Sequence, residues 1–197
     1  MIVLLVDAHG DNTAGKCSPD HLHKEWLWSK NFTKLLEEKF AEKGIKTEYI
    51  NPEDKDIPIT VSAARCNKFA QKYGKQNCIM ISPHNNAASG PGWKNASGFS
   101  VWVHNNASKA SCLLAKCINK MAIEAGLGGN RSQPKEGFWR ANFGILRETS
   151  MPAILTENLF MDNKEDLKKL HDEKIVNLLA DIHVKAVEEY IANKWFL

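Results

Sequence analysis

The chain has 197 residues, of which 43% are hydrophobic and 25% charged, an ordinary composition for a globular domain with a real core. Its 26 basic and 23 acidic residues leave a net charge of +3, and no lysine- or arginine-rich run occurs, so we expect no nucleic-acid partner. The five cysteines are odd in number and form no Cys-x-x-Cys pair, which argues against a disulfide framework and a thiolate zinc finger.

The first residues, from Met1 to Val6, form a short apolar run that stops at Asp7. The run has no basic start and no small-residue cleavage site, so we interpret it as a buried strand rather than a signal peptide. No apolar stretch is long enough to span a membrane. We therefore expect a chain synthesised in the cytoplasm without a signal peptide, with no integral membrane segment, that is a monomer.

Strands and helices are predicted to alternate along the chain. The predicted strands cover residues 2–6, 46–50, 77–82, 98–104, 143–147 and 152–156. The predicted helices cover residues 20–43, 58–73, 108–125, 163–170 and 172–192, and loops are expected at 89–97 and 128–142. This order predicts an α/β fold: a single domain with a mostly parallel, twisted sheet covered by helices on both faces.

Three of the predicted strands run into a metal-type or acidic residue, namely His9, His84 and Glu157. The carboxyl ends of parallel strands line one edge of a sheet, where ligands bind. Glu25, at the start of the first helix, falls on that same edge. Two histidines and a glutamate with an open fourth position describe a catalytic zinc site, and a further glutamate nearby would serve as general base.

The spacing leaves the role of His21 open. His21 and Glu25 are four residues apart, so they share a face of the predicted helix, and His21 is a candidate ligand beside or instead of Glu25. The simpler interpretation of His21 and His23 is a solvated first helical turn. Asp20 would then be the N-cap of that helix.

Glu157 has two explanations. A carboxylate at the end of a buried strand is costly unless it is paired, faces a cleft or lies near a cation. An ion pair with Arg147 or Arg140 is one explanation, and a base held near a metal-bound water is the other. Arg147 itself either holds substrate carboxylates or pairs with Glu148. Two loop tryptophans that flank the predicted cleft either stack on substrate or anchor the core: Trp93 and Trp139.

These motifs resemble those of the zinc-dependent N-acetylmuramoyl-L-alanine amidases found in bacterial autolysins and phage endolysins. The resemblance runs in order from residue 1 to about 191. Its pieces are Asp7-Ala-His-Gly10, Glu25, Arg65 with Asn67, Ile81-Ser-Pro-His-Asn-Asn-Ala87, Gly98-Phe-Ser-Val-Trp102 and Pro152-Ala-Ile-Leu-Thr-Glu-Asn-Leu-Phe160. Two departures concern residues next to ligands. Ala8 stands where the family usually has Gly, and Pro83 where it commonly has Ile or Val.

The resemblance implies that residues 1–197 form a zinc amidase catalytic domain. His9, Glu25 and His84 would be the Zn²⁺ ligands, which favours Glu25 over His21, and Glu157 would be the catalytic glutamate. The implied reaction is hydrolysis of the amide between N-acetylmuramic acid and L-alanine in peptidoglycan. The enzyme would act on the bacterial cell wall, as a phage or prophage lysin or after secretion by another route.

We further expect two residues to contact substrate, Asn86 and Arg147. Two other functions stay open. A zinc peptidase that cuts within the stem peptide would use the same histidines and glutamates. A non-catalytic cell-wall-binding module is the other alternative, and the intact Glu157 counts against it, because a binding module needs no residue that activates water.

Overall fold

The structure is a computed structural model that describes residues 1–196. Six strands form one sheet in the order β2-β1-β3-β6-β4-β5. All neighbouring strands are parallel except β4 and β6, which are antiparallel. The strands are β1 (Ile2–Leu5), β2 (Lys46–Tyr49), β3 (Cys78–Asn86), β4 (Ser100–Val103), β5 (Trp139–Arg140) and β6 (Ala153–Phe160). The mostly parallel sheet predicted from the sequence is confirmed.

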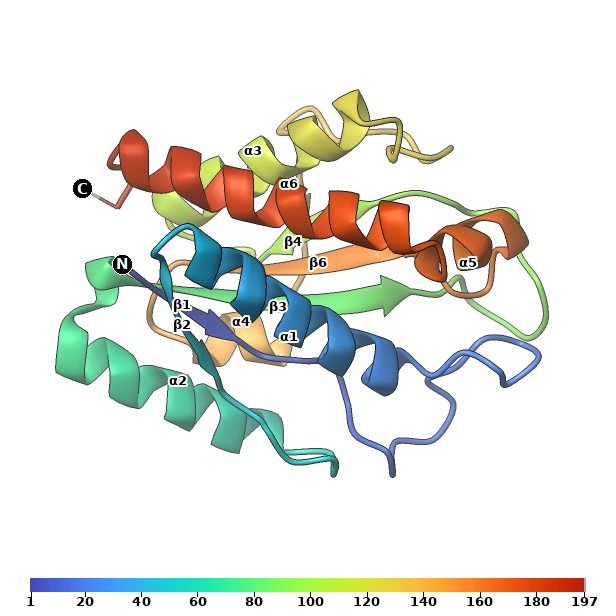
Figure 1. Ribbon diagram of the computed structural model, residues 1–197, viewed down its shortest axis with the longest axis horizontal. Coiled ribbons are helices and arrows are strands. Elements are labelled where there is room, and N and C mark those ends of the chain that lie inside the picture. The colour runs from blue at the N-terminus through green and yellow to red at the C-terminus, as the bar shows by residue number, and fades with distance from the viewer. Residues whose placement is uncertain (197) are drawn as a thin grey trace.

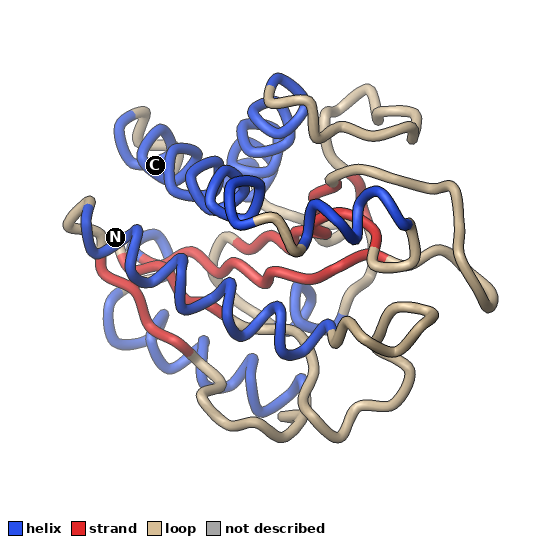
Figure 2. Tube along the Cα trace, turned by 45° about the vertical axis from the view of Figure 1, so that its right-hand side comes forward, coloured by secondary structure: helices blue, strands red, loops and turns tan. Residues whose placement is uncertain are grey.

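Helices cover both faces of this sheet (Figures 1 and 2). One face packs against α1 (Glu25–Glu42), α3 (Lys109–Glu124) and α6 (Glu173–Ala192), and the other against α2 (Ile59–Tyr73) and α4 (Gly144–Glu148). The remaining helices are the 3₁₀ turn η1 (Lys75–Asn77) and α5 (Lys164–Leu170). Within residues 1–196, no helix combines the length and apolarity needed to cross a bilayer.

The alternation of side chains along each strand divides the core into two layers and positions the site. On β1, Val3 and Leu5 pack into the layer below α1 and α6, whereas Leu4 packs into the layer below α2 and α4. On β6, Leu155 belongs to the α2–α4 layer, so Glu157 two residues later faces the same side. Met80 on β3 belongs to this layer as well, so His84 and Glu157 both lie on the α2–α4 face, near the carboxyl ends of their strands.

The first helix begins later than predicted. It starts at Glu25 with Lys24 as N-cap, and residues 16–24 form a loop closed by a bridge between Cys17 and Lys24. Asp20 is not the N-cap. Its carboxylate instead accepts hydrogen bonds from the Ser18 hydroxyl and the Leu22 amide, a local arrangement that competes with helix formation.

The predicted strand at 143–147 is wrong. Residues Gly144–Glu148 form α4, in which the adjacent side chains of Ile145 and Leu146 are both buried against α2 and the sheet. Such short apolar runs do not distinguish strand from helix. The sixth strand is instead β5, two residues long, inside the segment predicted to be a loop. Strands β3 and β6 also continue further than expected, so His84 and Glu157 lie within strands rather than after them.

Candidate metal centre

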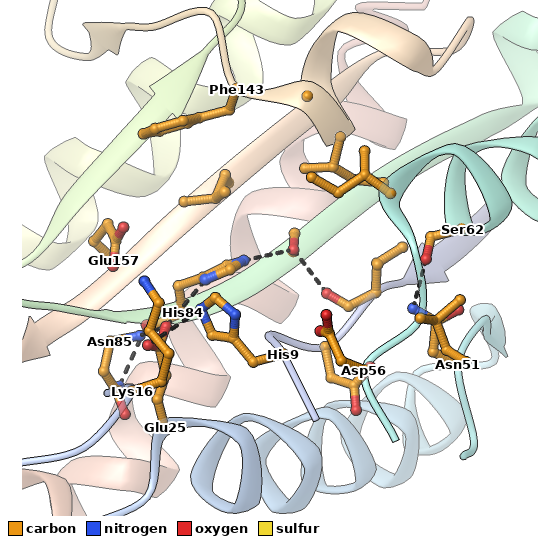
Figure 3. A pocket seen from close by; sticks show the side chains of 18 of the residues that line it. His9, Lys16, Glu25, Asn51, Asp56, Ser62, His84, Asn85, Phe143 and Glu157 are labelled. Carbon is orange, nitrogen blue, oxygen red and sulfur yellow. Dashed lines mark hydrogen bonds and ion pairs between the residues drawn. The ribbon is translucent and has the colours of Figure 1, made fainter. Parts of the chain in front are cut away.

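Three predicted ligands converge at the carboxyl end of the sheet. His9 lies in the loop after β1, Glu25 is the first residue of α1, and His84 is on β3 (Figure 3). Their donor atoms all lie within 4.8 Å of one another. Glu25 lies between the two rings, with Oε2 3.3 Å from Nε2 of His9 and Oε1 3.0 Å from Nδ1 of His84.

The hydrogen bonds around His84 identify which ring nitrogen is free to bind a cation. The Ser82 hydroxyl donates its single proton to the carbonyl oxygen of Val6, at 2.8 Å. The same hydroxyl oxygen is 3.1 Å from Nε2 of His84, so Nε2–H must be the donor in that contact. In the neutral ring, Nδ1 then carries the lone pair that faces the Glu25 carboxylate. A positive charge is needed between these two groups: a proton on Nδ1, or a metal ion.

Glu25 is held as a carboxylate although it is only 2% exposed. Burial alone would raise its pKa, but hydrogen bonds and charge from His84 and His9 bring the pKa well below its usual range. The amide of Asn85 also donates to Oε1, at 3.2 Å. As the first residue of α1, Glu25 lies at the positive end of the helix dipole, which favours a negative charge there.

The loop carrying His9 is strained and tightly packed. His9 has a φ of 60°, in the left-handed region that residues other than glycine seldom adopt. Gly10 permits a close approach between two backbone segments, since a Cβ there would lie 1.9 Å from the backbone nitrogen of Asp56. Strain of this kind is found at functional sites, where the surrounding structure enforces it.

Ser29 on α1 joins the two loops that depart from the family pattern. Its hydroxyl accepts a hydrogen bond from the Ala8 amide at 2.8 Å and donates one to the Pro83 carbonyl. Ala8 precedes His9 and Pro83 precedes His84, so one buried side chain ties both ligand-bearing segments to the helix that carries Glu25. Ala8 and Pro83, the two departures from the family pattern, therefore do not separate the donor atoms of the three candidate ligands.

Glu157 lies beside His84, its register partner on the neighbouring strand. Its Oε2 is buried and has no hydrogen-bond partner within residues 1–196. Burial and the nearby charge of Glu25 raise the pKa of Glu157 well above its usual value, while Lys16 and Arg131 act in the opposite direction. The ion-pair explanation of Glu157 is wrong, because Arg147 pairs with Glu148 and Arg140 pairs with Glu136.

The candidate ligands and Glu157 line one end of a cleft of about 720 Å³. The cleft continues past His9 toward the first turn of α2, where Asp56, Asn51 and Ser62 line it (Figure 3). Lys16, in the loop before α1, contributes to the rim next to Glu157, and Phe143 forms part of the wall (Figure 3). Lys16 was not predicted from the sequence, because it follows a glycine in a loop and carries no distinguishing pattern.

The two predicted substrate residues lie in different places. Asn86 lines the cleft. Arg147 lines a second pocket of about 230 Å³, where it pairs with Glu148 at 3.0 Å and donates to Asn142. Their contact with substrate stays a prediction. Arg65 and Asn67 bind backbone groups: Arg65 donates to the Ile50 carbonyl and Asn67 to the Glu148 carbonyl.

His21 lies outside α1, so the argument that it shares a helix face with Glu25 is wrong. Its side chain is exposed, with Nδ1 3.2 Å from the Cys17 sulfur. His23 is not in a solvated turn either, because it is only 2% exposed and lies 2.8 Å from Oδ1 of Asn85 and 3.3 Å from His171. His23 therefore supports the side chain of Asn85, the residue whose backbone amide donates to Glu25. No local pattern predicts this role, since its partners are distant in the chain.

Two imidazoles, a carboxylate and a second buried carboxyl group in one cleft are typical of metal-dependent hydrolases. The comparison with protein families gives a specific assignment. The chain belongs to the N-acetylmuramoyl-L-alanine amidase family, whose model matches residues 3–189. The resemblance inferred from the motifs is confirmed.

Individual relatives agree with this assignment. The endolysin of Bacillus phage SPP1 is 32% identical over 119 residues, and the sporulation-specific N-acetylmuramoyl-L-alanine amidase of Bacillus subtilis (strain 168) is 29% identical over 111 residues. These alignments include 57% and 56% of this chain but only 40% and 39% of the relatives, so the matched region spans less than half of their length.

The fold is shared with solved amidases along nearly the whole chain. The crystal structure of an N-acetylmuramoyl-L-alanine amidase from Clostridium difficile 630 superposes with a TM-score of 0.81 at 25% identity, covering 97% of both chains. An N-acetylmuramyl-L-alanine amidase from Mycobacterium smegmatis superposes with a TM-score of 0.83 at 15% identity, covering 98% of this chain and 97% of that one. The second similarity establishes the fold alone.

Proposed function

We propose that this protein is a zinc-dependent N-acetylmuramoyl-L-alanine amidase that hydrolyses the amide between the lactyl group of N-acetylmuramic acid and L-alanine. The observation that carries the proposal is the convergence of His9, Glu25 and His84 beside the unpartnered carboxyl group of Glu157. The bond selected rests on the family to which the chain belongs.

The donor set fits zinc. His9, Glu25 and His84 would hold the ion, and three protein ligands that leave a fourth position open are the pattern of catalytic zinc sites. The lone pair that Nδ1 of His84 directs toward the Glu25 carboxylate also calls for a cation. When bound, zinc supplies Lewis-acid chemistry, because it lowers the pKa of water to about 7 and polarises an amide carbonyl.

Glu157 performs the proton transfers in this proposal. Its carboxylate takes a proton from the attacking water and then delivers it to the nitrogen of the leaving L-alanine. A general base works best when its pKa lies near the operating pH, and burial moves the pKa of Glu157 in that direction. The strand register keeps Glu157 next to His84, so the base lies beside the candidate metal ligands.

The substrate is peptidoglycan, and the site of action is the bacterial cell wall. The names of two relatives, an endolysin and a sporulation-specific amidase, support this setting. Asn86 lines the cleft and would contact the muropeptide there. Arg147 would reach substrate only where the stem peptide extends toward the second pocket.

Mass spectrometry of soluble products from purified peptidoglycan, with and without a zinc chelator, tests the proposal. The expected products are sugar-free stem peptides with a new L-alanine amine, and a chelator should prevent their release. Chelator-sensitive cuts inside the stem peptide would instead identify a zinc peptidase. Zinc binding without cleavage of any bond would leave only the metal site and remove the proposed reaction.

A further inference from the structure

Arg131 differs from the other arginines of the chain. Three arginines, Arg65, Arg140 and Arg147, each pair with a glutamate. Arg131 has no carboxylate within 4 Å among residues 1–196, and its one hydrogen bond is donated to the Ser100 hydroxyl, at 3.3 Å. A guanidinium group carries five N–H donors, so most of those of Arg131 have no protein acceptor.

Aromatic rings hold the Arg131 guanidinium in place. Its central carbon lies 4.9 Å from the ring centre of Trp139, 5.9 Å from that of Trp102 and 5.7 Å from that of Phe160. Trp102 also donates to the Ser100 hydroxyl, at 3.2 Å, so this oxygen anchors both the indole and the guanidinium. Such packing fixes the orientation of the cation and limits the entropy that it would lose on binding a ligand.

The Arg131 group extends the row of functional side chains across the sheet. His84 on β3 is the register partner of Glu157 on β6, and Glu157 is the register partner of Ser100 on β4. Adjacent strands are about 4.8 Å apart, so Ser100 is about 10 Å from His84. Arg131 therefore lies at the end of this row, one strand beyond Glu157.

The aromatic rings also connect Arg131 to the cleft. Trp102 follows Ser100 by two residues and faces the same side of β4. Its ring centre lies 5.5 Å from that of Phe143, which forms part of the cleft wall. Arg131 thus packs, through Trp102, against a residue of the cleft wall.

We propose that Arg131 binds a carboxylate of the stem peptide, two or three residues beyond the bond that is cleaved. This inference rests on the proposed function. An extended peptide advances about 3.5 Å per residue, so the 10 Å from His84 to Ser100 corresponds to about three residues. Stem peptides carry carboxylates at such positions. A guanidinium group with free parallel donors binds a carboxylate through two hydrogen bonds.

Binding of N-acetylmuramoyl tripeptides by calorimetry tests this subsite. One tripeptide has free carboxylates on its second residue and at its C-terminus, and two others have one or the other carboxylate replaced by a carboxamide. The Glu157→Gln background keeps the ligand intact. Two variants are compared in this background: Arg131→Gln, and the matched control Lys135→Gln, which removes an exposed charge from the same loop.

We expect one of the two carboxamide substitutions to weaken binding about 10- to 100-fold, as does Arg131→Gln. Binding of that carboxamide ligand to the Arg131→Gln variant should be little weaker than with either change alone. The Lys135→Gln variant should bind each ligand as the Glu157→Gln protein does. The carboxamide that has this effect identifies the carboxylate that is bound. Arg131→Lys should restore part of the affinity, because it keeps the charge but not the paired donors.

If the loss of affinity from Arg131→Gln added to the loss from each carboxamide ligand, the proposal would be overturned. Such additivity would show that Arg131 supports the fold and does not bind a carboxylate. Equal affinity of the protein for all three tripeptides would overturn it as well. Failure of the proposed function is separate. It would appear as no amide cleavage by the wild-type enzyme, and the carboxylate preference in the binding experiment would be unaffected.

Discussion

The hydroxyl of Ser82 determines which nitrogen of His84 carries the lone pair, and that nitrogen, Nδ1, faces the carboxylate of Glu25. Because its proton goes to the Val6 carbonyl, the hydroxyl oxygen can only accept from Nε2–H of His84. The lone pair of His84 is thereby directed to Nδ1, where the candidate metal site lies. Partners of this kind orient a ligand and contribute to metal affinity.

The substitution Ser82→Ala should weaken zinc binding about 10- to 100-fold while the fold is retained. The variant removes the acceptor that fixes the tautomer of His84, and both ring nitrogens then compete for the proton. Competition with a chromogenic chelator measures the affinity. Ser132→Ala, at an exposed site, is the control. Unchanged zinc affinity in Ser82→Ala would show that the tautomer is set by another group.

The substitution Glu157→Gln should lower the turnover number about 10²- to 10⁴-fold and leave zinc content unchanged. Glutamine keeps the shape of the buried side chain but cannot take a proton from water. Zinc content by mass spectrometry and hydrolysis of a muramoyl peptide are measured on the same sample. A variant that bound zinc and hydrolysed at the wild-type rate would show that Glu157 is not the base.

Much of the site could be predicted because its residues are placed by local rules. His9, His84 and Glu157 occur at or near the ends of apolar segments, and parallel strands bring such positions to one edge of a sheet. Strands β3 and β6 are longer than predicted, but this does not change the position of the site, because the last residues of a parallel strand still lie at that edge of the sheet. Helix α1 begins five residues later than predicted, but Glu25 still lies at the edge of the sheet where the strands end.

The rest of the site depends on contacts that no local pattern encodes. Arg131 contacts Ser100 at the start of β4, a strand that runs antiparallel to β6, which is an exception to the parallel order that strand and helix alternation suggests. The local sequence predicts a solvated turn for His23, because its partner, His171, is 148 residues away in the chain. The error at α4 has another cause: a short apolar run such as residues 143–146 suits a strand and a short helix equally well.

The substitution Gly10→Ala should reduce the free energy of unfolding by about 1–3 kcal/mol, because the added methyl group would overlap the backbone at Asp56. It should also lower zinc affinity, since the displaced loop carries His9. Gly15→Ala is the matched control. Gly15 has a φ of 74°, but a Cβ there would meet nothing within 4 Å, so only the left-handed backbone conformation disfavours alanine, by about 1 kcal/mol.

Urea unfolding and zinc competition, measured on both glycine variants, separate the effect of the steric overlap at Asp56 from that of the left-handed backbone conformation. Gly10→Ala should affect unfolding and zinc affinity together, whereas Gly15→Ala should affect unfolding alone. If Gly10→Ala bound zinc as tightly as the wild type, the close approach of residues 10 and 56 would not position His9.

His183 should make the metal-free protein lose stability as the pH falls from 6.5 to 4. The ring is fully buried on α6 and accepts a hydrogen bond from the Thr156 hydroxyl at Nε2, while Nδ1–H donates to the Leu179 carbonyl. Burial lowers its pKa from 6.5 to about 4. Above pH 6.5 the ring is neutral in both states, so its contribution to stability is complete.

Between pH 6.5 and 4 the unfolded chain binds a proton at His183 that the folded protein does not, so the contribution of His183 to the free energy of unfolding falls by about 3 kcal/mol. The raised pKa of Asp7, about 6, acts in the opposite direction, so the contribution of His183 is the difference between the wild type and His183→Gln. Urea titrations at intervals across this range, in the presence of a chelator, measure the decline. His183→Gln should be less stable at neutral pH but show a shallower decline, because glutamine does not titrate. Lys185→Gln, on an exposed position of the same helix, should decline as the wild type does. An equally steep decline in His183→Gln would assign the acid sensitivity to other groups.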